Sequence, residues 1–166
     1  MQSSSTRRRR EKGAKEAGLT SEEMKNRHDI GLSRGGKNTK VHALVDGLGN
    51  PIRLIFTGGE IHDSKEAIPL LEGFELTGSA VLGDKAFGTA SILAYIRDNG
   101  GTVVIPPKSN AADPWECDYF HYKERHVVEC FFNKLKHFRR IATRYDKLTT
   151  MFQAFVYLAC IMIWLK

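Results

Sequence analysis

The segment from residue 122 to residue 140 constrains the fold of this chain more than any other stretch. Plotted at about 100° per residue, its polar and apolar side chains separate onto opposite sides of a helix. We therefore expect a helix over about residues 122–138 that packs one side on a core and turns the other outward. The polar residues Tyr122, Arg125, Glu129 and Lys136 fall within about 60° of one another. The apolar residues Val127, Phe131, Leu135 and Phe138 cluster on roughly the opposite side.

This polar side has two interpretations. One carboxylate among basic side chains and a phenol suits an acidic metal ligand beside phosphate-binding cations. A solvated helix face with i,i+4 ion pairs would carry the same residue types. Periodicity alone does not separate the two, so the rest of the chain must decide.

The basic residues are concentrated in two regions. The 166 residues carry a formal net charge of +6, with 42% hydrophobic and 27% charged residues, which is typical of a globular domain. Residues 1–40 hold 11 Lys/Arg against 5 Asp/Glu, and residues 122–147 hold 8 against 3. Two basic regions on a globular chain favour a polyanionic partner such as nucleic acid.

Neither end of the sequence predicts contact with a membrane. The N-terminus is polar and arginine-rich, without the apolar stretch of a signal peptide. The apolar run Ala154–Leu165 is too short to span a bilayer. We therefore expect no membrane partner, and a buried helix at the C-terminal end.

The chain divides into two parts. Residues 1–29 contain few large apolar side chains and a basic cluster at Arg7–Arg10, so we expect a basic, poorly ordered N-terminal segment. Residues 30–166 have the composition of a folded domain. Residues 31–38 approach the spacing of a phosphate-binding loop, but Asn38 stands where such a loop needs Ser or Thr, and a strand-like segment follows. We expect a flexible basic loop there instead.

The pattern of apolar segments predicts an α/β fold. Two strand-like segments joined by a Gly-rich turn indicate a β-hairpin, and a later strand–helix–strand series with short links indicates a parallel unit. A stretch without periodicity predicts a mobile loop before two final helices. In order, the expected elements are a hairpin of 39–46 and 51–57, a helix from about 62 to 72, strand 79–84, helix 89–99, strand 102–106, loop 108–120, and helices at about 122–138 and 149–165.

Two carboxylates are candidates for one metal site. Asp84 ends a short apolar strand, and ligands of open α/β sheets gather at the carboxyl ends of strands. Glu129 on the polar helix side is its natural partner, because two converging carboxylates can hold Mg²⁺ or Mn²⁺. Arg125 and Lys136 would then bind nucleic-acid phosphates, and Tyr122 could stack or donate a hydrogen bond. The alternative for Asp84 is a turn or cap residue.

Zinc is the alternative metal. Cys117, His121, His126 and Cys130 offer four ligands within 14 residues, but their spacing matches no common zinc module. Cys130 could equally be buried beside two phenylalanines. The three cysteines lack paired spacing, which favours reduced thiols in a cytoplasm.

Four positions of the helix also form a known signature. Tyr122-x2-Arg125-x3-Glu129-x6-Lys136 resembles the Y-(2)-R-(3)-E-(6)-K signature of DDE transposases from bacterial insertion sequences, in the IS-four/IS-five superfamily. Three further phrases, at residues 30–40, 42–51 and 139–146, are similar to that family. The resemblance covers about residues 30–150.

The resemblance implies a ribonuclease H-like catalytic core in which three acidic residues hold two divalent ions. Such enzymes hydrolyse a phosphodiester at each transposon end and use the freed 3′-hydroxyl to attack target DNA. On this chain Asp84 matches the second acid and Glu129 the third. Tyr122, Arg125 and Lys136 match DNA-contacting positions, and we expect Arg139 and Arg140 to contact DNA beside them.

The first acid of the family has no match. The family places it in an Asp-Ser/Thr setting on an early strand, but residues 1–6 read Met-Gln-Ser-Ser-Ser-Thr. Asp46 and Asp63 are weak substitutes, because they match a turn and a loop-to-helix position of the family. In ribonuclease H-like folds the first strand lies between the second and the fourth. Without it the hairpin and the later strands would share no neighbour, which leaves backbone groups unpaired.

The sequence therefore predicts the C-terminal part of a metal-dependent DDE transposase that lacks the central first strand and the first catalytic Asp. We expect no strand cleavage by this chain alone, with Mg²⁺ or Mn²⁺ as the cofactor of the complete site. The expected partners are transposon-end and target DNA, a second copy of the chain, and an upstream transposase segment, in the nucleoid of a bacterial cytoplasm. The alternative is an inactive DNA-binding remnant of such an enzyme.

Overall fold

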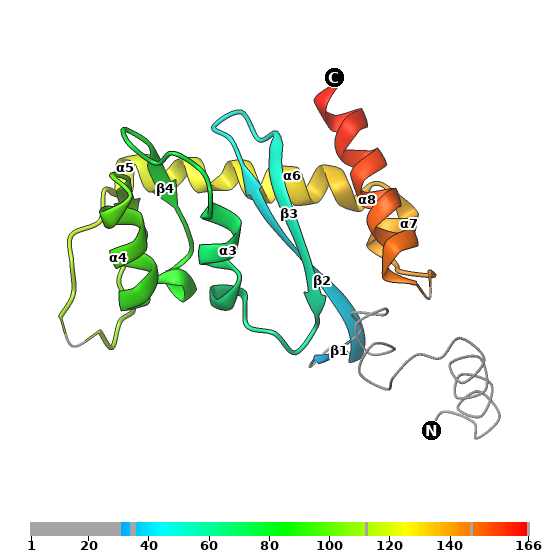
Figure 1. Cartoon of the computed structure of the whole chain (residues 1–166), viewed down its shortest axis with the longest axis horizontal. Coiled ribbons are helices and arrows are strands. Elements are labelled where there is room, and N and C mark those ends of the chain that lie inside the picture. Colours follow the sequence, from blue (N-terminus) through cyan, green and yellow to red (C-terminus); the bar gives the residue numbers. More distant parts are fainter. Residues whose placement is uncertain (1–30, 34–35, 112, 147, 166) are drawn as a thin grey trace.

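The computed structural model describes residues 31–33, 36–111, 113–146 and 148–165. The expected N-terminal segment 1–29 lies outside these residues. The described part begins with strands, continues with a mixture of helices and strands, and ends with helices (Figure 1). In chain order they are β1 (Gly31–Ser33), β2 (Gly36–Val45), β3 (Pro51–Gly58), the 3₁₀ helix η1 (Asp63–Lys65), α3 (Ala67–Leu71), β4 (Ala80–Leu82), η2 (Lys85–Phe87), α4 (Ala90–Asp98), β5 (Thr102–Val104), α5 (Tyr119–Tyr122), η3 (Lys123–Arg125), α6 (His126–Lys136), α7 (Arg139–Ala142) and α8 (Thr149–Trp164).

The predicted β-hairpin is confirmed. β2 and β3 pair antiparallel from Thr39 opposite Gly58 to Val45 opposite Pro51. The Asp46 carboxylate accepts hydrogen bonds from the backbone N–H groups of Leu48 (2.9 Å) and Asn50 (2.8 Å), which closes the turn. The flexible loop expected over residues 31–38 is wrong in part, because β1 pairs with the first residues of β2.

The predicted strand–helix–strand unit is also confirmed. β4 and β5 run parallel, with Val81 opposite Val103, and α4 connects them. Thr89 caps α4 by accepting a hydrogen bond from the N–H of Ile92, and Gly100 ends the helix with a φ of +76°. The helix buries Ile92, Leu93 and Ile96 in a cluster with Leu71 of α3 and with Ile105.

The strands of the described residues form two sheets that share no strand. One has the order β1-β2-β3 and the other pairs β4 with β5. For the described part of the chain, this confirms the expectation that the hairpin and the later strands have no common neighbour. The helical stretch from α5 to α6 connects the two groups, because α5 contacts β5 and α6 contacts β2 (Figure 1).

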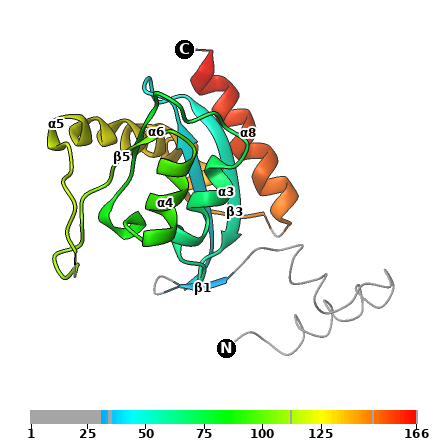
Figure 2. The same ribbon diagram turned by 60° about the vertical axis from the view of Figure 1, so that its left-hand side comes forward.

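Opposite faces of the hairpin pack on different helices. Leu44 of β2 joins the cluster of α3 and α4, whereas Val41, Ala43 and Val45, at alternate positions, pack on α6 and α8. This second cluster is centred on Phe131 and Val156, both 0% exposed. Figure 2 shows α8 alongside the hairpin. Helices therefore cover both faces of the hairpin.

The helix predicted over about residues 122–138 exists with different ends. It begins at Tyr119, passes through a 3₁₀ turn at Lys123–Arg125, and ends at Lys136. Phe131 and Leu135 are buried, as the periodicity predicted. In the segment before it, residues 108–111 and 113–118 form no helix or strand, as expected. Trp115 connects this segment to the end of β5 by donating a hydrogen bond to the carbonyl oxygen of Ile105 at 2.8 Å.

The expectation of a buried C-terminal helix is wrong for half of its surface. α8 packs one side on the hairpin, while side chains such as Leu158 (54% exposed) lie on the surface. Among the residues with defined positions, no helix combines the length and apolar character of a membrane span.

Candidate catalytic and DNA-contact site

Asp84 is separated from the end of β4 by Gly83, whereas the sequence predicted a strand that ends at Asp84 itself. It is exposed, and its Oδ1 accepts a hydrogen bond from the backbone N–H of Lys85 at 2.6 Å, which caps η2. The other carboxylate oxygen, Oδ2, makes none of the hydrogen bonds found among the described residues. Asp84 therefore acts as a cap residue and still presents a carboxylate oxygen to solvent.

Glu129 lies on the first turn of α6 and is held by Arg125. The guanidinium Nη2 donates to Glu129 Oε1 at 2.5 Å, and the guanidinium carbon lies 5.7 Å from the centre of the Tyr122 ring. The Glu129 side chain is 55% exposed and the Arg125 side chain is 28% exposed. Three of the four signature positions therefore form one connected group.

Arg125 also brings Asp84 and Glu129 into one electrostatic environment. Burial alone would lower the pKa of the Arg125 guanidinium. The hydrogen bond and charge of Glu129, followed by the charges of Tyr122 and Asp84, outweigh this effect and raise the pKa. Arg125 therefore forms an ion pair with Glu129 and is influenced more weakly by the charge of Asp84.

No third acid completes the site within the described ranges, where no three His, Cys, Asp or Glu side chains gather to hold a metal. Asp46 is used in the hairpin turn. Burial would raise its pKa, but hydrogen bonds from Asn50, Leu48 and Gly49 lower it. Asp63 binds Lys40 through Oδ1 at 3.0 Å. Neither residue therefore replaces the missing first acid in this structure.

The remaining predicted DNA contacts lie further along the chain. Lys136 ends α6 and is exposed, and Arg139 is exposed on α7. Arg140 has intramolecular partners: it donates to Asp146 Oδ1 at 3.1 Å and stacks on Phe155 at 4.0 Å. Lys136 and Arg139 are thus the more available cations, while Arg140 connects α7 to α8.

The four candidate zinc ligands do not form a site in the described structure. Cys117, His121, His126 and Cys130 do not gather, although all four lie in the described part of the chain. His121 Nδ1 lies 2.6 Å from Asp118 Oδ2, and His126 Nδ1 lies 3.0 Å from the carbonyl oxygen of Lys123. The thiols of Cys117, Cys130 and Cys160 are free.

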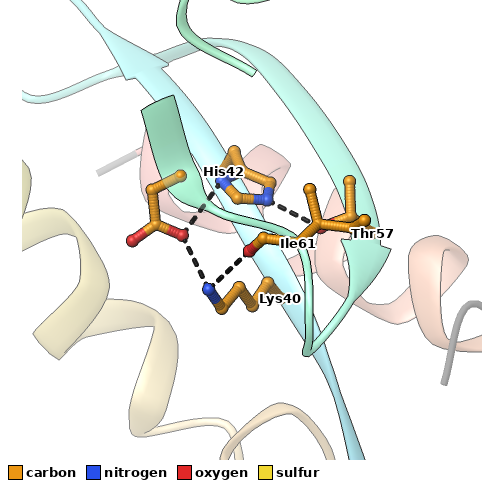
Figure 3. Close-up of polar contacts among 5 residues, drawn as sticks. Lys40, His42, Thr57 and Ile61 are labelled. Carbon is orange, nitrogen blue, oxygen red and sulfur yellow. Dashed lines mark hydrogen bonds and ion pairs between the residues drawn. The ribbon is translucent and has the colours of Figure 1, made fainter. Parts of the chain in front are cut away.

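A polar cluster on the hairpin was not predicted from the sequence (Figure 3). His42 is 7% exposed, with Nε2 at 2.7 Å from Thr57 Oγ1 and Nδ1 at 3.8 Å from Asp63 Oδ1. Lys40 Nζ donates to the carbonyl oxygen of Ile61 at 2.7 Å and to Asp63 Oδ1 at 3.0 Å. The cluster fixes η1 against β2. The sequence signal for this cluster is weak: Lys40, His42 and Leu44 are two residues apart, so they share one face of the strand.

This cluster predicts that stability falls in mild acid. Burial lowers the pKa of His42 below 6.5, against the opposing charges of Asp63 and Glu66, so the unfolded chain takes up a proton first. The stabilisation is complete above pH 6.5 and is lost as the pH falls through the lower pKa of the folded state. Urea unfolding at pH 7.5 and pH 5 measures how much the free energy of unfolding falls between the two pH values. This decrease should be smaller for His42→Asn than for wild type. Equal losses would contradict this role of His42.

Comparisons with known proteins agree on one family. Residues 3–114 match a family model described as a transposase DDE domain, and residues 81–166 match a second model of that description. A Brucella ovis protein named as transposase for insertion sequence element IS6501 is 43% identical over 129 residues, 77% of this chain and 98% of that protein. A Burkholderia cepacia protein named for element IS402 is 26% identical over 140 residues, 78% of this chain but only 64% of that protein. No solved structure matches the chain. This chain belongs to the DDE transposases of insertion sequences.

Proposed function

We propose that this chain is the C-terminal part of a metal-dependent DDE transposase of the IS-four/IS-five superfamily. Asp84 and Glu129 are its second and third catalytic acids, and the first acid comes from a segment that precedes the chain. The observation that carries this proposal is Arg125, which binds Glu129 and interacts with the charge of Asp84. A divalent ion could replace the Arg125 guanidinium at the Glu129 carboxylate, with Asp84 as its second ligand.

The donor set fits Mg²⁺ or Mn²⁺ in part. Both ions prefer oxygen ligands, and Asp84 and Glu129 present exposed carboxylates, while the described residues add no third acid. When bound, a pair of such ions would stabilise the attacking and leaving oxygens at a phosphodiester. Arg125 would then be released from Glu129 and be free to bind a DNA phosphate.

The two separate sheets support a ribonuclease H-like core with a missing strand. β2 and β4 belong to different sheets, and none of the described strands lies between them. A strand from the preceding segment would pair with both and carry the first Asp to the side of Asp84. Unpaired strand edges cost stability, so this strand would also stabilise the domain.

DNA binding by the chain should depend on the free cations of α6 and α7. We expect Lys136→Ala to weaken binding to element-end DNA and to reduce the slope of log affinity against log salt by about 1, because one phosphate contact is lost. Lys108→Ala is the matched control, since Lys108 is an exposed lysine outside the predicted DNA contacts and its removal should leave the slope unchanged. Fluorescence anisotropy between 50 and 200 mM salt, the range over which such contacts change affinity by roughly orders of magnitude, measures both slopes. Equal slopes for wild type and Lys136→Ala would contradict the assignment.

A nicking assay tests the proposed enzyme. The purified chain alone should not cleave element-end DNA in Mg²⁺, whereas the chain mixed with the translated product of the DNA before Met1 should release a 3′-hydroxyl. Cleavage by the chain alone that survives Asp84→Ala would refute the assignment of Asp84. The second candidate is an inactive DNA-binding remnant, favoured by the absence of a third acid among the described residues. It predicts that no upstream product restores cleavage.

We further propose that the complete enzyme acts as a dimer on two element ends, and that it works at the nucleoid of a bacterial cytoplasm. The net charge of +6 supports a partner as acidic as DNA.

A further inference from the structure

α8 has two apolar sides, and the fold covers only one. The helix Thr149–Trp164 contains no charged residue. Phe152, Val156 and Ala159 are buried against the hairpin and α6. A helix that is apolar all round is normally buried all round, so the second side calls for a partner.

The outward side of α8 repeats with the spacing of a helix–helix contact. At intervals of three and four residues it presents Met151 (49% exposed), Ala154, Leu158 (54%), Ile161 (54%) and Leu165 (81%). At about 100° per residue these side chains lie within roughly 80° of arc, on the side opposite the buried residues. This 3–4 alternation is the pattern that pairs two helices along a single seam.

The surface is large enough for a stable contact. Tyr157 and Met162, each 48% exposed, flank the seam on either side. Together with the seam and the nearby Trp164 they offer on the order of 800 Å², close to what one partner buries in a standard-size interface and above the usual apolar patch of a monomer. Trp164 also donates a hydrogen bond to the carbonyl oxygen of Pro51 at 3.1 Å, which holds this end of α8 against the hairpin. The surface is therefore fixed before any partner binds.

We propose that the α8 seam, Met151 to Leu165, docks against the same seam of a second copy of this chain. Two observations support a second copy as the partner. The seam carries no charge, so a two-fold contact with itself brings no like charges together. The chain's own residues 1–29 are rich in Ser, Arg, Lys and Glu, and lack the large apolar side chains needed to cover it.

Sedimentation equilibrium of the full chain tests the proposal. The wild-type chain should sediment with twice its mass of 18.7 kDa at micromolar concentration. Leu158→Glu and Ile161→Glu should each raise the dimer dissociation constant at least about 100-fold, because each places two charges inside the seam. The matched control is Leu48→Glu, which adds the same charge at an 83% exposed position of the hairpin turn and should remain dimeric. Far-ultraviolet circular dichroism checks that each variant keeps its helices.

Several outcomes would overturn the proposal. A monomeric wild type, or Glu variants that fold and dimerise as the wild type does, would exclude the α8 seam as the interface between copies. A wild-type monomer that co-sediments with phosphatidylcholine vesicles, and loses this binding in Leu158→Glu, would assign the seam to a membrane surface instead. Should both Glu variants unfold, dimerisation is tested with Leu158→Ala, which should weaken the dimer at least about tenfold. An unchanged dimer would contradict the proposal. These results do not depend on cleavage, so they are separate from the test of the proposed enzyme.

Discussion

Asp84→Asn or Glu129→Gln is expected to lower Mg²⁺-dependent end cleavage by at least about 1000-fold in the transposase reconstituted from this chain and the segment proposed to precede it. Each amide keeps the shape of the side chain and removes the charge that would hold a divalent ion. Asp84 should still cap η2 after substitution, since an amide oxygen can accept the hydrogen bond from Lys85. Quantified release of the 3′-hydroxyl end measures the effect.

The matched control for these variants is Glu124→Gln. Glu124 is an exposed carboxylate on the same helical stretch, in η3 beside Arg125. The Glu124→Gln variant should cleave DNA at a rate within about threefold of the wild-type rate, because surface substitutions away from a site have small effects. DNA affinity should stay close to wild type in all three variants. Cleavage at the wild-type rate by Glu129→Gln would show that Glu129 is not a catalytic residue. A loss of cleavage in Glu124→Gln as large as in Glu129→Gln would show that the change in net charge causes the effect.

Phe131→Ala is expected to destabilise the chain by about 3–5 kcal/mol, the cost of emptying a fully buried aromatic site. Phe131 is 0% exposed and packs in the cluster that joins α6, α8 and the hairpin. Its ring lies 5.2 Å from that of Phe132. Because the same helix carries Glu129, the proposed third acid, we also expect the position of Glu129 to be less well fixed. Urea unfolding followed by circular dichroism gives the free energy of unfolding.

Phe120→Ala is the control for the core. Phe120 is 77% exposed at the start of α5, so its removal should change the free energy of unfolding by no more than about 0.5 kcal/mol. A loss below about 1 kcal/mol for Phe131→Ala would show that this cluster contributes little to the fold.

Local sequence patterns predicted most of the elements. The Gly-rich turn predicted the hairpin, and the helix expected over residues 89–99 exists as α4. Both depend on a few neighbouring residues, here Asp46 in the turn and the cap Thr89. Contacts between distant parts were harder to predict. The periodicity of α8 indicated an apolar helix, but it contains no information on how much apolar surface the rest of the fold can cover.

The sequence predicted which side chains share one helix side, but not the contacts between them. The signature gave Tyr122, Arg125 and Glu129 on one helix side, and the structure joins them through one ion pair and one ring contact. The link between Arg125 and Asp84 joins residues far apart in the sequence, so helix periodicity could not show it. The same limit applies to Arg140, whose partners Asp146 and Phe155 depend on how α7 turns into α8.

The central proposal is that Asp84 and Glu129 hold one divalent-ion site. Substoichiometric Mn²⁺ added to the ¹⁵N-labelled chain broadens the amide signals nearest to the bound ion, even where binding is weak. We predict that the signals around Asp84 and those around Glu129 broaden together, that excess Mg²⁺ restores both, and that Asp84→Asn removes both. Broadening centred on the Asp118–His121 pair, or broadening at Glu129 that persists in Asp84→Asn, would contradict a shared site.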